Sequence, residues 1–346
     1  MAPSDLSKKE ALRLLKKGDL IELGRMADGQ KRALHPEDAI TFVVDRNINY
    51  TNVCINECRF CAFYRREGAR DAYVLGVEEL FSKIEETISL GGTQILLQGG
   101  LNPSLGIQFH MNMLTEIKNR FPSINVHGYS PPEISYFAKN SSLTIRETLG
   151  LLKVAGLDSI PGGGAEVLSD RVREAISPKK IRSSEWLRVM REAHRLGMKT
   201  TATMMFGSIE TPEDIVGHLE AIRELQAETA GFTAFIPWSF QPGNTALERT
   251  EPATAVDYLR VLAVSRIYLD NVPNVQASWV TQGLKIAQVA LRFGANDFGS
   301  TMIEENVVAS AGVSYSVSKE DIIEAIRAAG FRPAQRDTRY NILRYF

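Results

Sequence analysis

The sequence predicts an α/β fold: a (β/α)8 TIM-type barrel with an N-terminal helical extension and a C-terminal helix and tail. Short apolar runs that end in glycine or polar residues alternate with amphipathic helical stretches along the chain. This alternation is typical of βαβ units and a parallel sheet. About eight such units in one chain favour a closed barrel, with an open doubly wound sheet as the second interpretation.

The composition is that of an ordinary globular protein. The 346 residues include 40 Lys and Arg against 41 Asp and Glu, a formal net charge of -1, whereas nucleic-acid-binding domains usually carry a basic excess. No apolar run approaches the roughly 18 residues that suggest a membrane span. The charged start of the chain lacks the apolar stretch of a signal peptide. We therefore expect no nucleic-acid or membrane partner and a cytoplasmic location.

The elements follow one another without a low-complexity linker, so we expect a helical extension over 1–40 and a single barrel domain over 41–346. In the extension, Ala11, Leu14 and Leu15 belong to an apolar stripe at helical spacing. The predicted strands cover 42–50, 94–98, 124–129, 158–160, 199–206, 231–237, 275–280 and 295–298. The predicted helices cover 77–90, 108–120, 145–155, 184–196, 212–229, 253–269 and 319–329. The charged tail, 332–346, is expected to pack against the barrel.

Three cysteines, Cys54, Cys58 and Cys61, lie within eight residues directly after the first predicted strand. An odd number so closely spaced is a poor disulfide framework. Zinc would need a fourth ligand, such as the distant His110 or His127. A [4Fe–4S] cluster is held by cysteine thiolates, and three thiolates would leave one iron open to a ligand or substrate. The cluster is the favoured interpretation and zinc the alternative.

The spacing C-x3-C-x2-C, with Phe60 before the last cysteine, resembles the motif of the radical S-adenosylmethionine (SAM) superfamily. The resemblance covers most of the chain. It implies that Cys54, Cys58 and Cys61 bind a [4Fe–4S] cluster and that the methionine end of SAM binds the open iron. One electron then releases a 5′-deoxyadenosyl radical, which takes hydrogen from a small-molecule substrate. The electron would come from a donor such as flavodoxin or ferredoxin.

Further motifs resemble the SAM contacts of that superfamily. Gln98, Gly99 and Gly100 end the second predicted strand, where family members contact the methionine amino group. Glu166 follows a run of three glycines and would accept hydrogen bonds from the ribose hydroxyls, and Tyr64 would contact the adenine. Both glycine segments are also compatible with simple turns.

A partial match to the adenine-contact motif lies at the end of the fifth predicted strand. Gly207 and Glu210 stand at two of its four marked places, Thr203 replaces a glycine and Met205 replaces an isoleucine. Met205 and Gly207 are therefore candidate SAM contacts. A strand of core methionines is the alternative for this stretch.

Longer stretches resemble the family of cyclic dehypoxanthinyl futalosine synthases of menaquinone biosynthesis. They cover 50–68, 96–109, 127–134, 158–174 and 284–312. The resemblance implies that the substrate is dehypoxanthine futalosine, which carries a benzoate carboxylate. It also implies that the 5′-deoxyadenosyl radical removes H4′ of its ribose, that the C4′ radical adds to the aromatic ring, and that one electron and one proton then leave. The alternatives are a sister radical enzyme (an aminofutalosine synthase or a deazaflavin-cofactor synthase) and, outside enzymes, a zinc-binding interaction protein.

Polar residues at the carboxyl ends of barrel strands face the active site. On this basis Asp297, Glu133 and His127 are candidates for binding polar groups of the substrate or accepting the final proton. The substrate carboxylate calls for an arginine or a group of backbone amides, and Arg65 is one of several arginines that the sequence offers.

Overall fold

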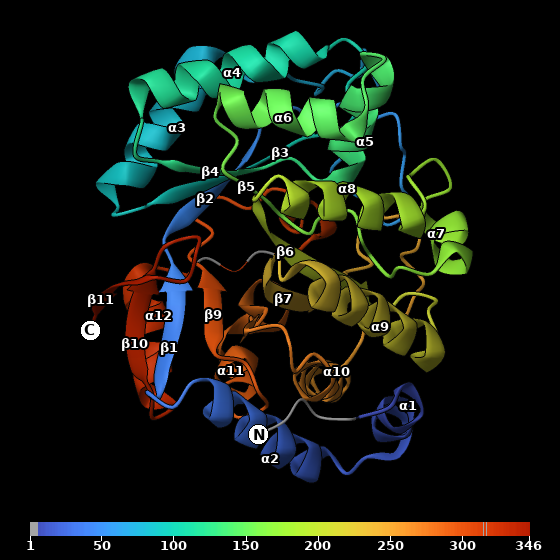
Figure 1. Cartoon of the computed structure of the whole chain (residues 1–346), viewed down its shortest axis with the longest axis vertical. Coiled ribbons are helices and arrows are strands. Elements are labelled where there is room, and N and C mark those ends of the chain that lie inside the picture. The colour runs from blue at the N-terminus through green and yellow to red at the C-terminus, as the bar shows by residue number, and fades with distance from the viewer. Residues whose placement is uncertain (1–5, 314, 316) are drawn as a thin grey trace.

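The structure, a computed structural model, describes residues 6–313, 315 and 317–346. A ring of parallel strands is surrounded by helices (Figure 1). A seven-stranded parallel sheet has the order β2-β3-β4-β5-β6-β7-β8, and a four-stranded sheet has the order β11-β10-β1-β9. The strands of the larger sheet are β2 (Asp45–Asn49), β3 (Gln94–Gln98), β4 (Asn125–Gly128), β5 (Ser159–Ile160), β6 (Lys199–Phe206), β7 (Phe232–Ser239) and β8 (Asn274–Val275).

The two sheets join into one barrel. β1 (Ala39–Val43) runs into β2 with only Val44 between them, and β1 pairs in parallel with β9 (Asp297–Ser300). An isolated parallel bridge between Gln276 and Asp297 links the end of β8 to β9. With β1 and β2 counted as one broken strand, the ring is complete, so the predicted barrel is confirmed.

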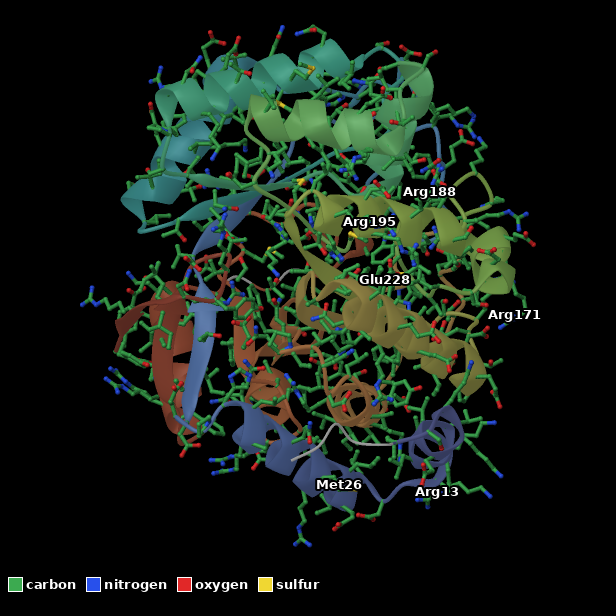
Figure 2. All side chains as sticks on the ribbon, viewed as in Figure 1. Arg13, Met26, Arg171, Arg188, Arg195 and Glu228 are labelled. Carbon is green, nitrogen blue, oxygen red and sulfur yellow. The ribbon has the colours of Figure 1, made fainter. Side chains whose placement is uncertain are left out.

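Helices cover the outside of this ring. Among the described residues they are α3 (Val77–Ser89), α4 (Ile107–Arg120), α5 (Pro131–Asn140), α6 (Ile145–Ala155), α7 (Asp170–Ile176), α8 (Ser183–Arg195), α9 (Pro212–Thr229), α10 (Ala255–Tyr268), α11 (Trp279–Ala290) and α12 (Lys319–Ala328), with a 3-10 turn at Ala309–Ala311. Their outer faces are charged, as Arg188, Arg195 and Glu228 on α8 and α9 show (Figure 2). Arg195 and Glu228 form an ion pair of 3.3 Å.

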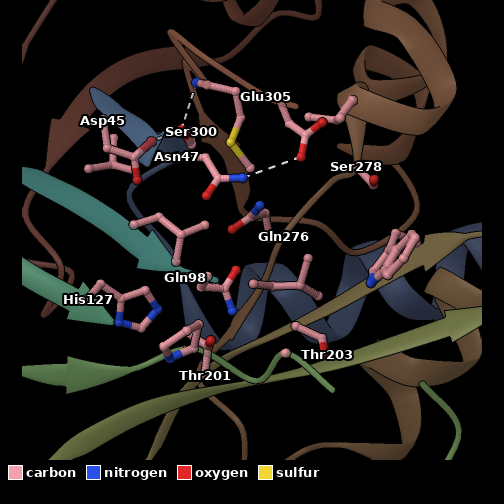
Figure 3. Close-up of a pocket in the computed structure, with 18 of the residues that line it drawn as sticks. Asp45, Asn47, Gln98, His127, Thr201, Thr203, Gln276, Ser278, Ser300 and Glu305 are labelled. Atoms are coloured by element: carbon pink, nitrogen blue, oxygen red, sulfur yellow. Dashed lines mark hydrogen bonds between the residues drawn. The ribbon is translucent and has the colours of Figure 1, made fainter. Parts of the chain in front are cut away.

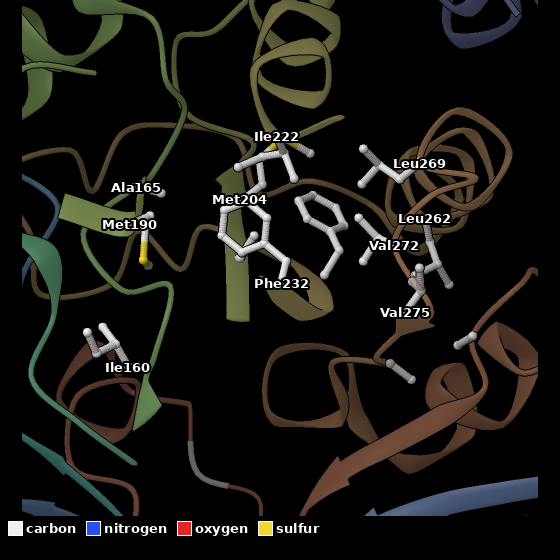
Figure 4. Packing of buried hydrophobic residues seen from close by; sticks show 14 of the residues in the cluster. Ile160, Ala165, Met190, Met204, Ile222, Phe232, Leu262, Leu269, Val272 and Val275 are labelled. Carbon is white, nitrogen blue, oxygen red and sulfur yellow. The ribbon is translucent and has the colours of Figure 1, made fainter. Parts of the chain in front are cut away.

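The main core lies between the strands and these helices. Met204 of β6, Phe232 of β7 and Ile222 of α9 are buried and lie in one cluster (Figure 4). Successive side chains of a strand point to opposite faces, so Thr201 and Thr203 of β6 face the interior of the barrel, where they line a cavity. The barrel therefore has an apolar outer layer and a more polar inner one.

The N-terminal extension consists of two helices, α1 (Lys8–Lys17) and α2 (Leu20–Leu34). α2 packs against α10, and α1 packs against α9, where Lys8 pairs with Glu220 and Lys16 with Glu213. The helical character expected here is confirmed from residue 8 onward. The first five residues of the predicted 1–40 extension lie outside the described residues, and the boundary at residue 40 stays a prediction.

The C-terminal tail is a hairpin, β10 (Arg332–Arg336) and β11 (Ile342–Tyr345). β10 pairs in parallel with β1, with Phe42 opposite Gln335, so the expected packing against the barrel is confirmed. The hairpin itself was not predicted, because its charged sequence lacks the apolar alternation of a buried strand.

Two further stretches differ from prediction. The strand expected over 275–280 stops at Val275, and the helix α11 begins at Trp279, whose indole N–H donates to the carbonyl of Ser300 (2.8 Å). No helix was predicted directly after β4, but α5 begins there, with Pro131 and Pro132 at its first positions, where proline is favoured. Within the described residues, no helix combines the length and apolar character that a membrane crossing needs.

Candidate active site

A cavity of about 270 Å³ lies in the centre of the barrel. Every barrel strand, or the residue directly after it, contributes to the wall. Gln98 of β3, His127 of β4, and Thr201 and Thr203 of β6 face the same space (Figure 3). Asn47 donates a hydrogen bond of 3.3 Å to Glu305, which belongs to the loop after β9. The wall thus combines polar groups with apolar side chains such as Trp238 and Trp279, as small-molecule sites usually do.

The cysteine loop follows β2 at the carboxyl end of the barrel. The backbone N–H of Cys54 donates to Arg65 (3.0 Å), and the backbone N–H of Arg65 donates to Asn52 (2.7 Å), so the loop folds back on itself. All three cysteines carry free thiols. Burial raises the pKa of Cys58 to about 12, with the Lys180 cation acting against this and the other two thiols adding to it. The three sulfur groups are therefore neighbours.

The donor set fits an iron–sulfur cluster. Lys180 acts electrostatically on both Cys58 and Cys61, and backbone N–H groups of Tyr64 and Phe63 bond to the Cys61 sulfur. A nearby cation and N–H donors stabilise thiolates, and thiolates are what such a cluster requires. In the part of the chain that the structure describes, no group of three or more His, Cys, Asp and Glu side chains is arranged around one metal ion.

The two glycines after β3 lie tightly against this loop. A Cβ on Gly100 would stand 2.2 Å from the carbonyl oxygen of Val53 and 2.7 Å from the Cβ of Cys54. A Cβ on Gly99 would stand 2.5 Å from the ring of Tyr50. Only glycine fits at either place, so β3 ends in direct contact with the cysteine loop.

Glu133 lies behind these glycines. One carboxylate oxygen accepts hydrogen bonds from the Tyr50 hydroxyl (2.8 Å) and the Gly99 N–H (3.0 Å), and the other accepts both the N–H and the hydroxyl of Ser130. Burial raises its pKa. Glu133 is not among the residues that line the cavity, so its side chain holds the start of α5 and the end of β3 together.

Asp297 is likewise buried, and its carboxylate already accepts hydrogen bonds from the protein. Arg336 donates to both of its oxygens, Nε at 2.6 Å and Nη2 at 3.0 Å. The hydroxyl of Thr41 and the N–H of Gly299 also donate to it. Asp297 does not line the cavity, whereas its partner Arg336 does.

His127 lines the cavity. Its Nδ1 lies 2.7 Å from the Ser159 hydroxyl oxygen, and its Nε2 has no hydrogen-bond partner among the described residues. Burial lowers its pKa to about 3, and the Arg336 charge adds to the effect. The imidazole is therefore neutral at physiological pH.

Glu166 connects the cysteine loop to the cavity. It lines the cavity and pairs with Lys180 (2.8 Å) and Arg173 (3.3 Å). The ammonium group of Lys180 also lies over the ring of Phe60, 5.0 Å from its centroid. Lys180 is thus placed between Glu166 and the loop that carries the cysteines.

The remaining predicted SAM contacts lie outside the cavity wall. Met205 is buried in a small cluster with Val172, Ile176 and Phe240. Gly207 adopts a positive φ of 90°, and its N–H donates to Glu210. Tyr64 is half-buried, and its carbonyl accepts a hydrogen bond from Arg65. Of the predicted site residues, Gln98, Glu166 and His127 reach the cavity, and the others surround the cysteine loop or support it.

Sequence reasoning missed several residues of the wall. Asp45 and Asn47 alternate along β2, and Gln94 lies opposite Asp45 on β3. Polar side chains at every second position of a predicted buried strand are a signal that could have identified them, since they share one face. Arg336 carried no such signal, because the tail was not recognised as a strand.

The fold and the site define a barrel enzyme that works with a bound iron–sulfur cofactor. Residues 48–222 match the Radical SAM superfamily model, and residues 229–345 match the CofH/MqnC C-terminal region. The chain belongs to the radical SAM superfamily, whose enzymes use a [4Fe–4S] cluster and SAM.

Among curated relatives, the chain is 47% identical to a cyclic dehypoxanthine futalosine synthase of Halalkalibacterium halodurans, covering 99% of this chain and 92% of that one. It is 41% identical to a protein of the same name from Streptomyces coelicolor, covering 98% and 86%. It is also 45% identical to a 5-amino-6-(D-ribitylamino)uracil--L-tyrosine 4-hydroxyphenyl transferase of Methanopyrus kandleri, covering 89% and 85%.

Among solved structures, methylornithine synthase superposes with a TM-score of 0.74 at 16% identity, covering 95% of this chain and 94% of that one. At this identity the likeness shows the fold alone, and it is the radical SAM barrel.

Proposed function

We propose that this enzyme converts dehypoxanthine futalosine to cyclic dehypoxanthine futalosine in menaquinone biosynthesis. The observation that carries the proposal is the 47% identity to a synthase of that name over nearly the whole chain. The cavity inside the barrel supports it, because a radical reaction needs a substrate held in place and shielded from solvent, and Glu166 and Lys180 connect this cavity to the cysteine loop. The relatives reported above carry the names of enzymes, which favours this proposal over a zinc-binding interaction protein.

In this proposal Cys54, Cys58 and Cys61 hold the cluster. When bound, the cluster and SAM supply a 5′-deoxyadenosyl radical, which removes the ribose H4′. Gln98, Gly99 and Gly100 offer backbone groups to the methionine end of SAM, and Glu166 accepts hydrogen bonds from its ribose. Phe60, Tyr64, Met205 and Gly207 shape the space around the adenine.

The substrate occupies the central cavity, with its ribose toward the glycines and its aromatic ring deeper in the barrel. After the C4′ radical adds to that ring, a base must accept the ring proton and one electron must leave; the bound cluster, having given up one electron to SAM, would be an acceptor for it. His127 is the candidate for this role because, unlike Glu133 and Asp297, it lines the cavity, and its Nε2 is unpartnered among the described residues. Its lowered pKa makes it a weak base, so it would pass the proton on and not keep it. Glu133 and Asp297 do not contact the substrate in this proposal. They hold Gly99 and Arg336 in position through hydrogen bonds.

Two further expectations belong to this proposal. The cluster must be reduced by a partner, and a one-electron carrier such as flavodoxin or ferredoxin would serve. Free thiols that bind iron persist in a reducing compartment, which agrees with a cytoplasmic location.

A second function has a specific observation in its favour, because relatives named as the 4-hydroxyphenyl transferase reach 45% identity. The two functions differ in substrate, since the transferase is named for tyrosine and a ribityl-substituted uracil. The same protein preparation can be tested with both.

The deciding experiment is a mass-spectrometric product assay. The cluster is reconstituted without oxygen, and SAM, a reductant and dehypoxanthine futalosine are added. We expect 5′-deoxyadenosine together with a product two hydrogens lighter than the substrate. If 5′-deoxyadenosine forms while this substrate is untouched and the tyrosine and uracil pair reacts, the second function is correct. If the protein holds a full cluster but converts neither dehypoxanthine futalosine nor the tyrosine and uracil pair, both proposals fail.

A further inference from the structure

The C-terminal hairpin forms a part of the cavity wall that lies at a distance from the cysteines. Arg336, Thr338 and Tyr340, at the end of β10 and in the turn after it, line the cavity. Because Phe42 lies opposite Gln335, Arg336 stands level with Val43. The cysteine loop begins after Asn49, so at about 3.3 Å per residue it lies up to roughly 20 Å away along the broken strand β1–β2, and less along the tilted barrel axis.

Arg336 is the only Lys or Arg among the described residues that line this cavity. The acidic side chains in the wall are Asp45, Glu166 and Glu305, and Glu166 is neutralised by Lys180 and Arg173. Burial raises the pKa of Asp45 and of Glu305, and both carboxyl groups already accept hydrogen bonds from the protein, Asp45 from Gln94 and Ser300 and Glu305 from backbone N–H groups such as that of Val308. Among the described wall residues, Arg336 is therefore the permanently charged cation that an anion in this cavity can reach.

The guanidinium group of Arg336 is held rigidly with donors to spare. Nε and Nη2 donate to Asp297, and Nη1 donates to the carbonyl of Asp337 (3.1 Å). An arginine side chain has five N–H donors; three are engaged here, which leaves two. The ring of Tyr340 stacks on the guanidinium at 3.8 Å. The group cannot swing away, so its remaining N–H bonds have a fixed direction.

Tyr340 adds a further donor. Its hydroxyl has no hydrogen-bond partner in the described part of the chain, and burial raises its pKa, so it carries its proton. The hydroxyl of Thr338, by contrast, already donates to Gln94. Since Asp297 balances the charge of Arg336, recognition here depends on directed N–H and O–H donors more than on net charge. Planar, bidentate donors of this kind suit a carboxylate.

We propose that Arg336 and Tyr340 form a carboxylate subsite that binds the benzoate carboxylate of the substrate and so sets how deep its aromatic ring lies. This inference rests on the proposed function, because the substrate is the one proposed there. It assigns the carboxylate to the C-terminal hairpin, whereas Arg65 is engaged with Asp71 and with carbonyls of its own loop.

The test compares two ligands on the reconstituted enzyme with SAM present. The first is dehypoxanthine futalosine, and the second is its primary carboxamide, which has the same shape without the charge. Dissociation constants are measured by calorimetry for the wild type, Y340F, the double variant D297N/R336Q and the control R339M. The double variant leaves no buried unpaired carboxylate, and Arg339 is an exposed cation of the same turn.

We expect the wild type and R339M to bind the acid about 10- to 100-fold more tightly than the amide, the range for hydrogen bonds to charged groups. The preference should fall to less than about 3-fold in D297N/R336Q, while amide binding changes little, and Y340F should lose part of it. A general disturbance of the fold would weaken both ligands equally and leave their ratio unchanged.

Each outcome decides a different point. If the wild type binds and converts the acid but both variants keep the wild-type ratio, the subsite is wrong and the proposed function stands. If D297N/R336Q does not fold, an unchanged ratio in Y340F is enough to overturn the subsite as proposed. If the wild type neither binds nor converts the acid, the proposed substrate is wrong and the subsite falls with it.

Discussion

At the scale of single residues, the cysteine loop is where each side chain has a defined task. Cys58 is buried beside Lys180, and Cys54 touches the end of β3 at Gly100. Replacing any of the three cysteines by alanine should remove one iron ligand and abolish cleavage of SAM. Iron and sulfide content, about four of each in the wild type, and release of 5′-deoxyadenosine measure this directly.

The control is Ile55→Ala, an exposed change in the same loop, which should leave both cluster content and SAM cleavage intact. A cysteine-to-alanine variant that still assembles a cluster and cleaves SAM would contradict the assignment.

Gly100 provides a second prediction at this scale. Gly100→Ala places a Cβ 2.2 Å from the carbonyl oxygen of Val53, so the cysteine loop must move away from β3. We expect a loss of about 1–3 kcal/mol in the free energy of unfolding, as for other overpacked sites, and reduced cluster content.

The matched control is Gly29→Ala. Gly29 lies within α2, it is exposed, and an added Cβ would meet nothing within 4 Å. Alanine is the better helix former, so this variant should gain up to about 1 kcal/mol and keep its cluster. Equal behaviour of the two variants in chemical unfolding and iron analysis would show that Gly100 is not constrained by the loop.

At the scale of elements, α5 connects helix capping to the site. Ser130 donates through its N–H and its hydroxyl to Glu133, and the same carboxylate holds the Gly99 N–H. Ser130→Ala removes one of these donors and should cost about 1–2 kcal/mol of stability. Because Glu133 then loses one of its constraints, the affinity for SAM should also fall.

A second capping box separates these two effects. Thr144 and Glu147 cap α6 with the same arrangement on an exposed turn. Thr144→Ala should cost about 1 kcal/mol with no change in SAM affinity. If calorimetric titration with SAM finds both variants equally weakened, or both unchanged, the connection from α5 through Glu133 to the glycines is refuted.

The elements also show how far the sequence could predict this fold. Regular strands such as β3 and β6 and long amphipathic helices such as α9 were predicted because periodicity alone defines them. The hairpin β10–β11 was missed because β11 is exposed along its whole length, and β10 contains polar and charged residues, one of them the buried Arg336, in place of an apolar alternation. Trp279 and Val280 resembled a strand, yet Trp279 is placed by a contact with β9 that is distant in sequence.

At the site, too, features defined by a local sequence pattern were predicted, and features that depend on contacts distant in sequence were not. The three cysteines and the glycines beside them form local motifs, so they were found from the sequence. Glu133 and Asp297 were expected to face the substrate, and the structure engages them with Tyr50, Gly99 and Arg336 instead. No local pattern shows which partner a buried carboxylate finds, because that depends on how the strands are brought together.

At the scale of the whole molecule, the cavity is a product of the closed barrel. Its wall takes residues from opposite ends of the chain: Asp45 and Asn47 of β2, the strand that leads into the cysteine loop, and Arg336, Thr338 and Tyr340 of the C-terminal hairpin. The pairing of β10 with β1 is therefore part of the site as well as of the fold. Substitutions in the C-terminal hairpin should change how deep the substrate lies in the cavity, and substitutions in the cysteine loop should change binding of the cluster and SAM.

Because several histidines are buried, the free energy of unfolding of the whole molecule should depend on pH in a predictable way. His110, His127 and His218 are at most 7% exposed, and burial lowers the pKa of each to about 3. In the unfolded chain each titrates near 6.5. Between these values the unfolded state binds more protons than the folded state, so the free energy of unfolding falls as the pH is lowered from about 6.5 toward 3. At pH 5 each histidine should cost about 2 kcal/mol, which is large against a typical total of about 5–15 kcal/mol.

The variant His218→Asn isolates one of these contributions. Asparagine can accept the hydrogen bond that the Leu168 N–H donates to Nδ1 of His218, but it does not titrate. Buried carboxyl groups with raised pKa, such as Glu133, act in the opposite sense and are common to both proteins. The loss of stability between pH 7 and pH 5, measured by urea unfolding, should therefore be about 2 kcal/mol smaller in the variant than in the wild type. An identical loss in both proteins would mean that His218 takes up its proton in the folded state. Water would then have to reach its Nε2, which is buried without a hydrogen-bond partner among the described residues.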